Sequence, residues 1–166
     1  MMISVVRLAS DRIGSAAAEL ALVMPLLLAL MLGGFELGNY FLSEHVVQKA
    51  VRDASRYAAR LPMTSYPACS PTEDAEADIQ RLARTGTPEE GGAVRLFGWT
   101  DNSTVTVALI CDPSGTYTGL YSEFPDGVPV VTVTARVPYP PFFGVLGLSS
   151  STLNLNAASQ AAVFGA

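Results

Sequence analysis

The most consequential chemical group in this chain is a carboxylate at the start of a long apolar run. Glu19 directly precedes the segment from Leu20 to Phe35, which contains no charged residue. Gly14 lies five residues before Glu19, and Ser15 directly follows Gly14. A charge in a membrane segment costs free energy and usually marks function. The segment from Gly14 to Glu19 is therefore the leading candidate functional segment.

Other polar residues could in principle form a catalytic set, namely His45 and the serines at 149–151. No nucleophile-elbow motif surrounds those serines, and the remaining parts of an active site are missing as well. Two cysteines and one histidine are too few for a metal cluster built from these ligands. The acidic stretch that begins at Glu73 lacks the spaced oxygen ligands and the loop glycine of a calcium site. We expect no enzyme activity, no cofactor, no metal and no small-molecule substrate.

Cys69 and Cys111 both follow the apolar run, so they lie on the same side of a membrane that it spans. Outside the cytoplasm they can form one intrachain disulfide that closes a loop of about 43 residues. Such a loop stabilises a fold by about 4 kcal/mol in the chain-entropy description. The alternative is two unpaired buried thiols. The choice depends on the compartment.

These groups must be positioned by a membrane helix. The 17 steps from Glu19 to Glu36 span about 26 Å of helix, slightly less than the roughly 30 Å of bilayer hydrocarbon. Both carboxylates can therefore lie near opposite interfaces at modest cost. Pro25 is tolerated in a membrane helix. Gly34 and Gly38 form a GxxxG pair, which favours close helix association.

The basic residues Arg7 and Arg12 precede the apolar run, which predicts a cytoplasmic N-terminus. The cations that follow the run weaken this prediction: Lys49, Arg52, Arg56 and Arg60. A cleaved secretory signal is the alternative, but no A-x-A site follows the run at the expected distance. We expect the segment to be retained as an anchor. The formal net charge of −5, without an evident basic patch beyond Leu42, argues against a nucleic-acid partner.

Beyond the membrane, the sequence predicts an α+β fold. Apolar side chains recur every three to four residues up to Leu61, before Pro62, so one helix is expected from about Ala16 to Leu61. Its amphipathic second half either packs on its own sheet or offers a surface to partner helices, and both can hold. A second helix follows, capped by Ser70 or Thr72 and ended by Gly86.

The remaining sequence has strand character in four segments, 93–99, 103–111, 128–140 and a weaker one at 151–163. A three- or four-stranded antiparallel sheet against the long helix is the natural packing. The apolar segment 139–143 is either an exposed binding edge or a loop that covers the core. We expect a leader at 1–14, a transmembrane helix at 15–42 and an extracytoplasmic α+β domain at 43–166.

The N-terminal third of the sequence resembles a known family. Gly14, Ser15 and Glu19 match the processing pattern of type IV prepilins, in which a glycine precedes the cut and a glutamate is the fifth mature residue. The segments Glu36-Leu37-Gly38 and Ala54-Ser55-Arg56-Tyr57-Ala58 resemble those of the TadE-like family of tight-adherence (Flp-type) pilus proteins. The resemblance covers about residues 12–60, and the β-rich remainder fits loosely.

This resemblance implies a pilin-like pseudopilin or minor pilin of a bacterial adhesion pilus, active in surface adhesion and biofilm formation. A prepilin peptidase would cut between Gly14 and Ser15 at the cytoplasmic face of the inner membrane. The new amino group of Ser15 and the carboxylate of Glu19 would then serve pairing between subunits. The implied partners are the membrane, the peptidase, other pilus subunits and the assembly platform. Major Flp pilins are much shorter, so the resemblance favours an accessory subunit. The alternative function is an uncleaved, membrane-anchored binding domain.

Overall fold

The computed structural model describes residues 12–111, 127–144 and 153–165, with the side chains of 12–15 left out of the description. The chain divides into two compact units, one ending at Asn39 and one beginning at Tyr40. Three segments of the expected organisation lie outside the described residues. They are most of the leader (1–11), the segment 112–126 between two of the expected strands, and the serines 149–151, which belong to the segment 145–152.

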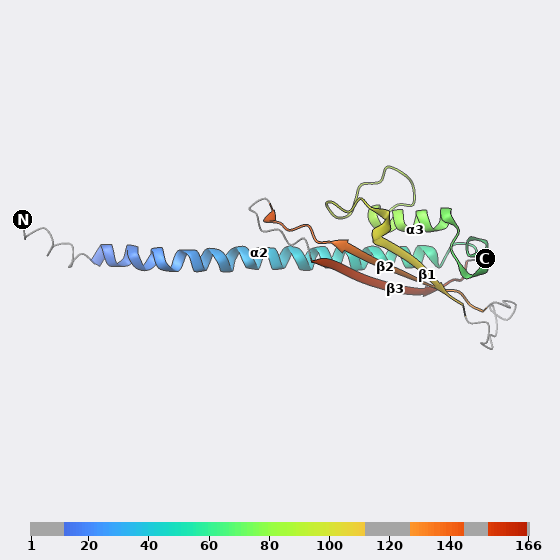
Figure 1. Ribbon diagram of the computed structural model, residues 1–166, viewed down its shortest axis with the longest axis horizontal. Helices are drawn as coiled ribbons and strands as arrows, with labels where there is room; N and C mark the ends of the chain where they lie inside the picture. The colour runs from blue at the N-terminus through green and yellow to red at the C-terminus, as the bar shows by residue number, and fades with distance from the viewer. Residues whose placement is uncertain (1–11, 112–126, 145–152, 166) are drawn as a thin grey trace, which may run out of the picture. The chain divides into compact units, whose positions relative to one another are not determined.

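A long helix, α2, runs from Arg12 to Ala58 and contains Pro25 (Figure 1). The expected helix from about Ala16 to Leu61 is thus confirmed within a few residues at each end. The chain leaves the helix through a tight turn, in which the Leu61 N–H donates to the carbonyl of Ala58. Pro62 follows, and it has no N–H with which to continue the hydrogen-bond ladder. Two short 3₁₀ turns come next, η1 (Met63–Ser65) and η2 (Pro67–Cys69).

The second helix, α3, spans Glu73–Thr85. Thr72 is its N-cap, because its hydroxyl accepts a hydrogen bond from the Ala75 N–H at 3.3 Å. Three acidic residues in the first turn complement the positive end of the helix dipole. Gly86 ends the helix in the left-handed conformation at φ 89°, and its N–H bonds the carbonyl of Leu82. Of the two caps expected from the sequence, the structure uses Thr72.

Three antiparallel strands form one sheet in the order β1-β2-β3. They are β1 (Val105–Ile110), β2 (Val130–Pro138) and β3 (Asn154–Ala162), with η3 (Asn102–Thr104) just before β1. Val107 pairs with Val133, and Val133 pairs with Ser159. This confirms the smaller of the two expected strand numbers among the described residues.

The expected strand at 93–99 is wrong, because residues 95–98 form bends and a turn and the rest of the segment has no regular secondary structure. Gly98 has φ 80°, which is incompatible with an extended strand. The Arg95 N–H bonds the carbonyl of Arg84 at the end of α3, and not a neighbouring strand. The Val105 carbonyl on β1 accepts a hydrogen bond from Gln80 of α3. Hydrogen bonds to α3 thus hold both this segment and the start of β1 in place.

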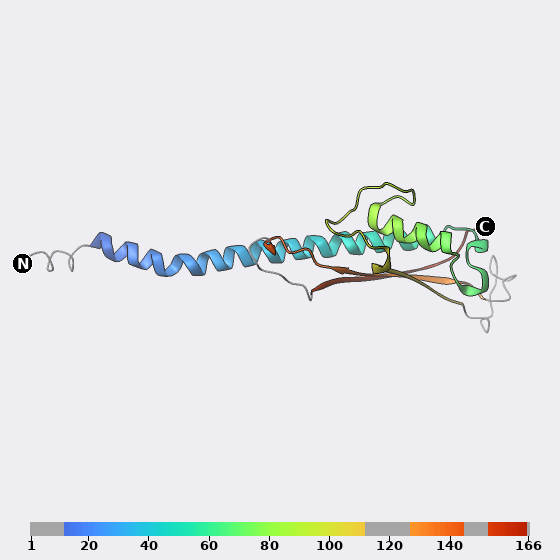
Figure 2. The ribbon, with the colours of Figure 1, turned by 45° about the horizontal axis from the view of Figure 1, so that its top comes forward.

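The core lies between one face of the sheet and the two helices, which Figure 2 shows on the same side of the strands. Alternate residues of β2 are buried, and the expected apolar stripe of α2 faces them. The stripe residues Val47, Ala50, Val51, Ala54 and Ala58 are all fully buried. The second half of α2 therefore packs on its own sheet, and the predicted α+β fold is confirmed. A surface for partner helices remains a prediction.

The segment 139–143 contains one residue that covers the core and one that is exposed, and its role as a binding edge stays a prediction. The ring of Tyr139 is buried and lies 5.2 Å from the ring of Tyr40. The side chain of Phe142 is 65% exposed. Tyr139 thus closes the core, whereas Phe142 faces outward.

Candidate functional site

The first half of α2 is the only helix among the described residues that is long and apolar enough to cross a membrane. Its best window has a mean hydropathy of 2.2, and none of that window is buried inside the structure. Large apolar side chains on it are exposed, with Leu22 at 81%. Exposed apolar surface of this extent is unfavourable in water, at roughly 25 cal/mol per Å². Lipid or other apolar chains are the environments that suit this segment.

Gly14, Ser15 and Glu19 all belong to α2. The bond between Gly14 and Ser15 lies near the N-terminal end of the described part of α2. Four residues separate Ser15 from Glu19, which is about one helical turn. The two residues therefore lie on the same face of the helix, and the Glu19 side chain is exposed.

Gly34 and Gly38 lie on one face of α2, one turn apart, and both are exposed. A Cβ added at either position would meet no atom within 4 Å, and the same holds for Gly33. Packing within this chain therefore does not require these glycines. Their absent side chains leave the backbone open to close approach by another helix.

Cys69 and Cys111 are joined by a disulfide, with their Cα atoms 6.1 Å apart. Cys69 ends η2, and Cys111 directly follows β1. The bridge thus ties the loop after α2 to the end of an edge strand. Two residues at this corner, Ala68 and Cys69, have positive φ values of 51° and 57°. Residues other than glycine rarely adopt this conformation, so the corner is strained.

The residues considered for catalysis are not brought together in the described part of the chain. His45 is exposed on α2, and the serines at 149–151 lie outside the described residues. The described residues contain no group of three or more His, Cys, Asp or Glu side chains that could hold a metal ion. The structure therefore gives catalysis no geometric support.

Sequence reasoning missed a concave cluster of arginines in the second unit. A cavity of about 340 Å³ is lined by Asp53, Arg56, Tyr57, Arg60, Leu82, Gly86 and Arg95. Arg56 comes from the last turn of α2 and Arg60 from the turn that follows it, whereas Arg95 comes from the segment 93–99. The spacing of Arg56 and Arg60 by four residues was visible in the sequence. The approach of Arg95 was not, because it depends on the turns after α3.

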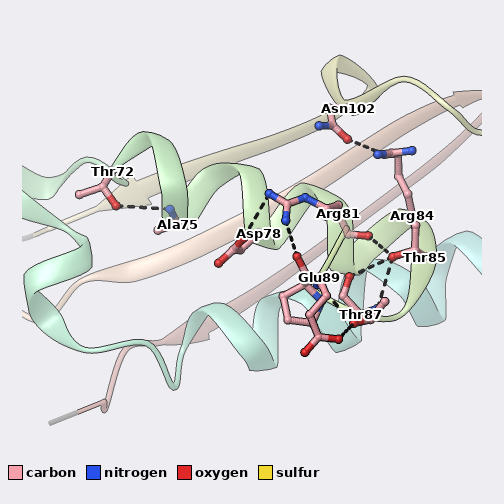
Figure 3. A network of polar contacts seen from close by, with 10 residues as sticks. Thr72, Ala75, Asp78, Arg81, Arg84, Thr85, Thr87, Glu89 and Asn102 are labelled. Carbon is pink, nitrogen blue, oxygen red and sulfur yellow. Dashed lines mark hydrogen bonds and ion pairs between the residues drawn. The ribbon is translucent and has the colours of Figure 1, made fainter. Parts of the chain in front are cut away.

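A network of polar contacts fixes the loop after α3 beside this cavity (Figure 3). The Thr85 hydroxyl donates to the carbonyl oxygens of Arg81 and Thr87. Arg81 pairs with Asp78 at 3.3 Å and also donates to the carbonyl of Pro88. The loop is thereby held against the helix by side chains of the helix itself.

Two tyrosines near the cavity have side-chain pKa values above the ordinary value for tyrosine. Burial raises the pKa of Tyr66 to about 12, and the neighbouring Tyr57 adds to the shift. The Tyr66 hydroxyl donates to the carbonyl of Ala58 at 2.6 Å. The pKa of Tyr57 is also raised, first by burial and then by the negative charge of Asp78. Both tyrosines therefore remain neutral near pH 7. Tyr66 acts as a hydrogen-bond donor, and Tyr57 packs against the core.

These features define a class of protein, a small α+β domain that follows an apolar helix suited to a membrane. Residues 14–56 match the sequence model of the TadE-like protein family, so this segment of the chain is TadE-like. The match begins at Gly14 and includes Glu19, Gly34 and Gly38. Searches of the curated proteins and of the solved structures found no significant match. The TadE-like segment indicates involvement in tight-adherence pilus assembly, where proteins of this kind are structural and not enzymes.

Proposed function

We propose that this protein is a pseudopilin or minor pilin of a tight-adherence pilus and is processed by a prepilin peptidase. The observation that carries the proposal is the family match that begins at Gly14, together with the position of Glu19 one turn after Ser15. Cleavage after Gly14 would make Ser15 the new N-terminus and Glu19 the fifth residue. It would also remove Arg7 and Arg12, which favour retention of that end at the cytoplasmic surface.

In the proposed mechanism, the Glu19 carboxylate pairs with the new ammonium group of a neighbouring subunit. A charge in an apolar bundle is costly unless it is paired and hydrogen-bonded, because little water is present to solvate it. The exposed Gly34 and Gly38 would let the same helices approach closely. The subunit would begin in the inner membrane, with its C-terminal domain outside the cytoplasm, and would act in pilus biogenesis and surface adhesion. Its partners would be the peptidase, other pilus subunits and the inner-membrane assembly platform.

N-terminal sequencing of the mature protein from its native host tests the proposed processing. We expect a chain that starts at Ser15. An intact Met1 would instead support an uncleaved anchored binding domain, and a start after the apolar run would indicate a secretory signal. Either result refutes the proposal.

The pairing role of Glu19 has its own test. We expect Glu19→Ala to leave membrane insertion unchanged, since the apolar run is intact, and to abolish assembly into pili as seen by electron microscopy. Glu36→Ala is the matched control, because it removes a carboxylate near the other end of the span. Normal piliation in Glu19→Ala, or an equal loss in both variants, would contradict the specific pairing role.

A further inference from the structure

The arginine cavity between α2 and the segment 93–99 has the chemistry of an anion-binding site. Three guanidinium groups line it, from Arg56, Arg60 and Arg95, against the single carboxylate of Asp53. Arginine presents its donors as a planar fork that matches a carboxylate or phosphate in two hydrogen bonds. The lining therefore favours a negatively charged ligand.

One of the three arginines is already held in place. The Arg95 side chain pairs with Asp53 at 2.9 Å. It also lies over Gly86, where an added Cβ would approach its Nε to 3.1 Å. The backbone N–H of Arg95 is fixed to the carbonyl of Arg84. Because this group is ordered before any ligand arrives, less conformational entropy is lost on binding.

The other two arginines have no acceptor or ion-pair partner among the described residues. Arg56 and Arg60 are exposed, and both line the cavity at the point where the chain leaves α2. The helix dipole favours cations near the C-terminus of a helix. The helix dipole does not explain why Arg56 and Arg60 line the same cavity as Arg95.

The shape of the cavity favours a side chain as the occupant. Its lining includes Leu82, which is nearly buried, and Tyr57, which is partly buried. These apolar surfaces suit the methylene stem of a glutamate, while the guanidinium groups suit its carboxylate. A volume of about 340 Å³ is sufficient for one or two side chains.

Further cations extend the site along α2. Lys49 and Arg52 are exposed, and with Arg56 they follow spacings of three and four residues, which is one helical face. From Lys49 to Arg56 this row covers about 10 Å at helical rise, and Arg60 lies in the turn just beyond it. A single small anion cannot contact such a row. A chain with several carboxylates can.

We propose that this arginine cavity and the adjoining row on α2 bind an acidic peptide segment of another protein chain, with one carboxylate inserted between Arg56, Arg60 and Arg95. The chain's own net charge of −5 disfavours nucleic acid as the ligand. Equating the bound segment with a neighbouring pilus subunit rests on the proposed function. The binding itself does not, since it needs neither cleavage nor assembly.

The test measures binding of a fluorescein-labelled, glutamate-rich peptide to the full-length protein in non-ionic detergent, by fluorescence anisotropy. Arg56→Gln combined with Arg60→Gln removes two cavity charges, and we expect the Kd to rise by at least about tenfold. The matched control is Arg136→Gln, which removes one exposed cation on β2, outside both the cavity and the row, and it is compared with Arg56→Gln alone. Because Arg136 does not belong to the proposed site, we expect its Kd to rise by less than about threefold. The fluorescence of Trp99, which is buried and is the only tryptophan of the chain, reports that each variant is folded.

Three further probes separate the ligand classes. The glutamine counterpart of the peptide should not bind, and neither inorganic phosphate nor a short single-stranded DNA at equal charge should displace the peptide. Equal losses in Arg56→Gln and in the Arg136→Gln control would reduce the site to diffuse charge attraction and overturn the proposal. Displacement by phosphate or DNA, or absence of peptide binding to the unaltered protein, would overturn it as well. None of these outcomes depends on whether the chain is processed at Gly14.

Discussion

Removal of the disulfide between Cys69 and Cys111 should destabilise the second unit by about 2–4 kcal/mol. The bridge links residues 42 positions apart. Loss of this constraint raises the entropy of the unfolded chain, which corresponds to about 4 kcal/mol at 25 °C. Strain at the corner offsets part of that amount, because Ala68 and Cys69 have left-handed backbones. Such residues cost about 1–2 kcal/mol each, and some of this is recovered once the bridge is gone.

The double variant Cys69→Ala/Cys111→Ala provides the measurement. Urea unfolding is followed by the fluorescence of Trp99, which is 1% exposed in the core. The midpoint should fall, and the slope of free energy against urea should rise, because an unbridged chain exposes more surface when it unfolds. Reduction of the unaltered protein by a thiol should have the same effect. For a small domain with a total stability of about 5–15 kcal/mol, the expected loss is large.

Ala68→Gly separates the two contributions. Glycine adopts φ 51° without the steric cost that alanine has, so this variant should be more stable by up to about 1 kcal/mol with the bridge intact. The gain should shrink in the variant without cysteines, where Ala68 is free to relax. A loss below about 1 kcal/mol on bridge removal, with an unchanged urea slope, would refute the account. An equal gain from Ala68→Gly with and without the bridge would refute the assignment of strain to the bridge.

Two further predictions concern the region around the cavity. Tyr66→Phe should cost about 1 kcal/mol by removing the hydrogen bond to Ala58. Since the folded pKa of Tyr66 is about 12 and its ordinary value is 10.0, the neutral phenol stabilises the fold below pH 10, and this contribution is lost between pH 10 and 12. Urea midpoints against pH should show that decline in the unaltered protein and a weaker one in Tyr66→Phe; equal declines would contradict it. Gly86→Ala should cost about 1–2 kcal/mol in the same assay, because φ is 89° and the new Cβ would press on Arg95; a neutral result would exclude this strain.

Much of the fold was predictable because its signals are local. The apolar stripe of α2 follows the helical period, and its residues Val47, Val51 and Ala54 are buried as expected. Thr72 and Gly86 mark the ends of α3 through hydrogen bonds within a few residues. In such cases the physical cause lies inside the segment, so the sequence alone contains it.

The predictions from sequence failed where contacts with distant segments of the chain determine the local structure. The segment 93–99 has β-branched and aromatic residues, but it forms turns, because Arg95 bonds to Arg84 at the end of α3 and Trp99 is buried with its Nε1 donating to Thr104. The arginine cavity has the same origin. Its sequence pattern on α2 was visible, but its third cation reaches it from a loop whose path depends on contacts with α3.

Under the proposed function, the apolar half of α2 explains how one carboxylate would have a decisive role in assembly. Side chains such as Leu22 and Leu26 are 81% and 61% exposed, so this segment needs a non-aqueous environment. A lipid bilayer and a bundle of apolar helices satisfy that need almost equally, since lipid tails are as apolar as leucine. Transfer between these environments therefore gains little from the hydrophobic effect. Under the proposed function, close packing at Gly34 and Gly38 and a charge pair formed by Glu19 would be the interactions that differ between them. We infer that the free energy favouring assembly over the membrane comes from these few positions, although they form a small part of the helix surface.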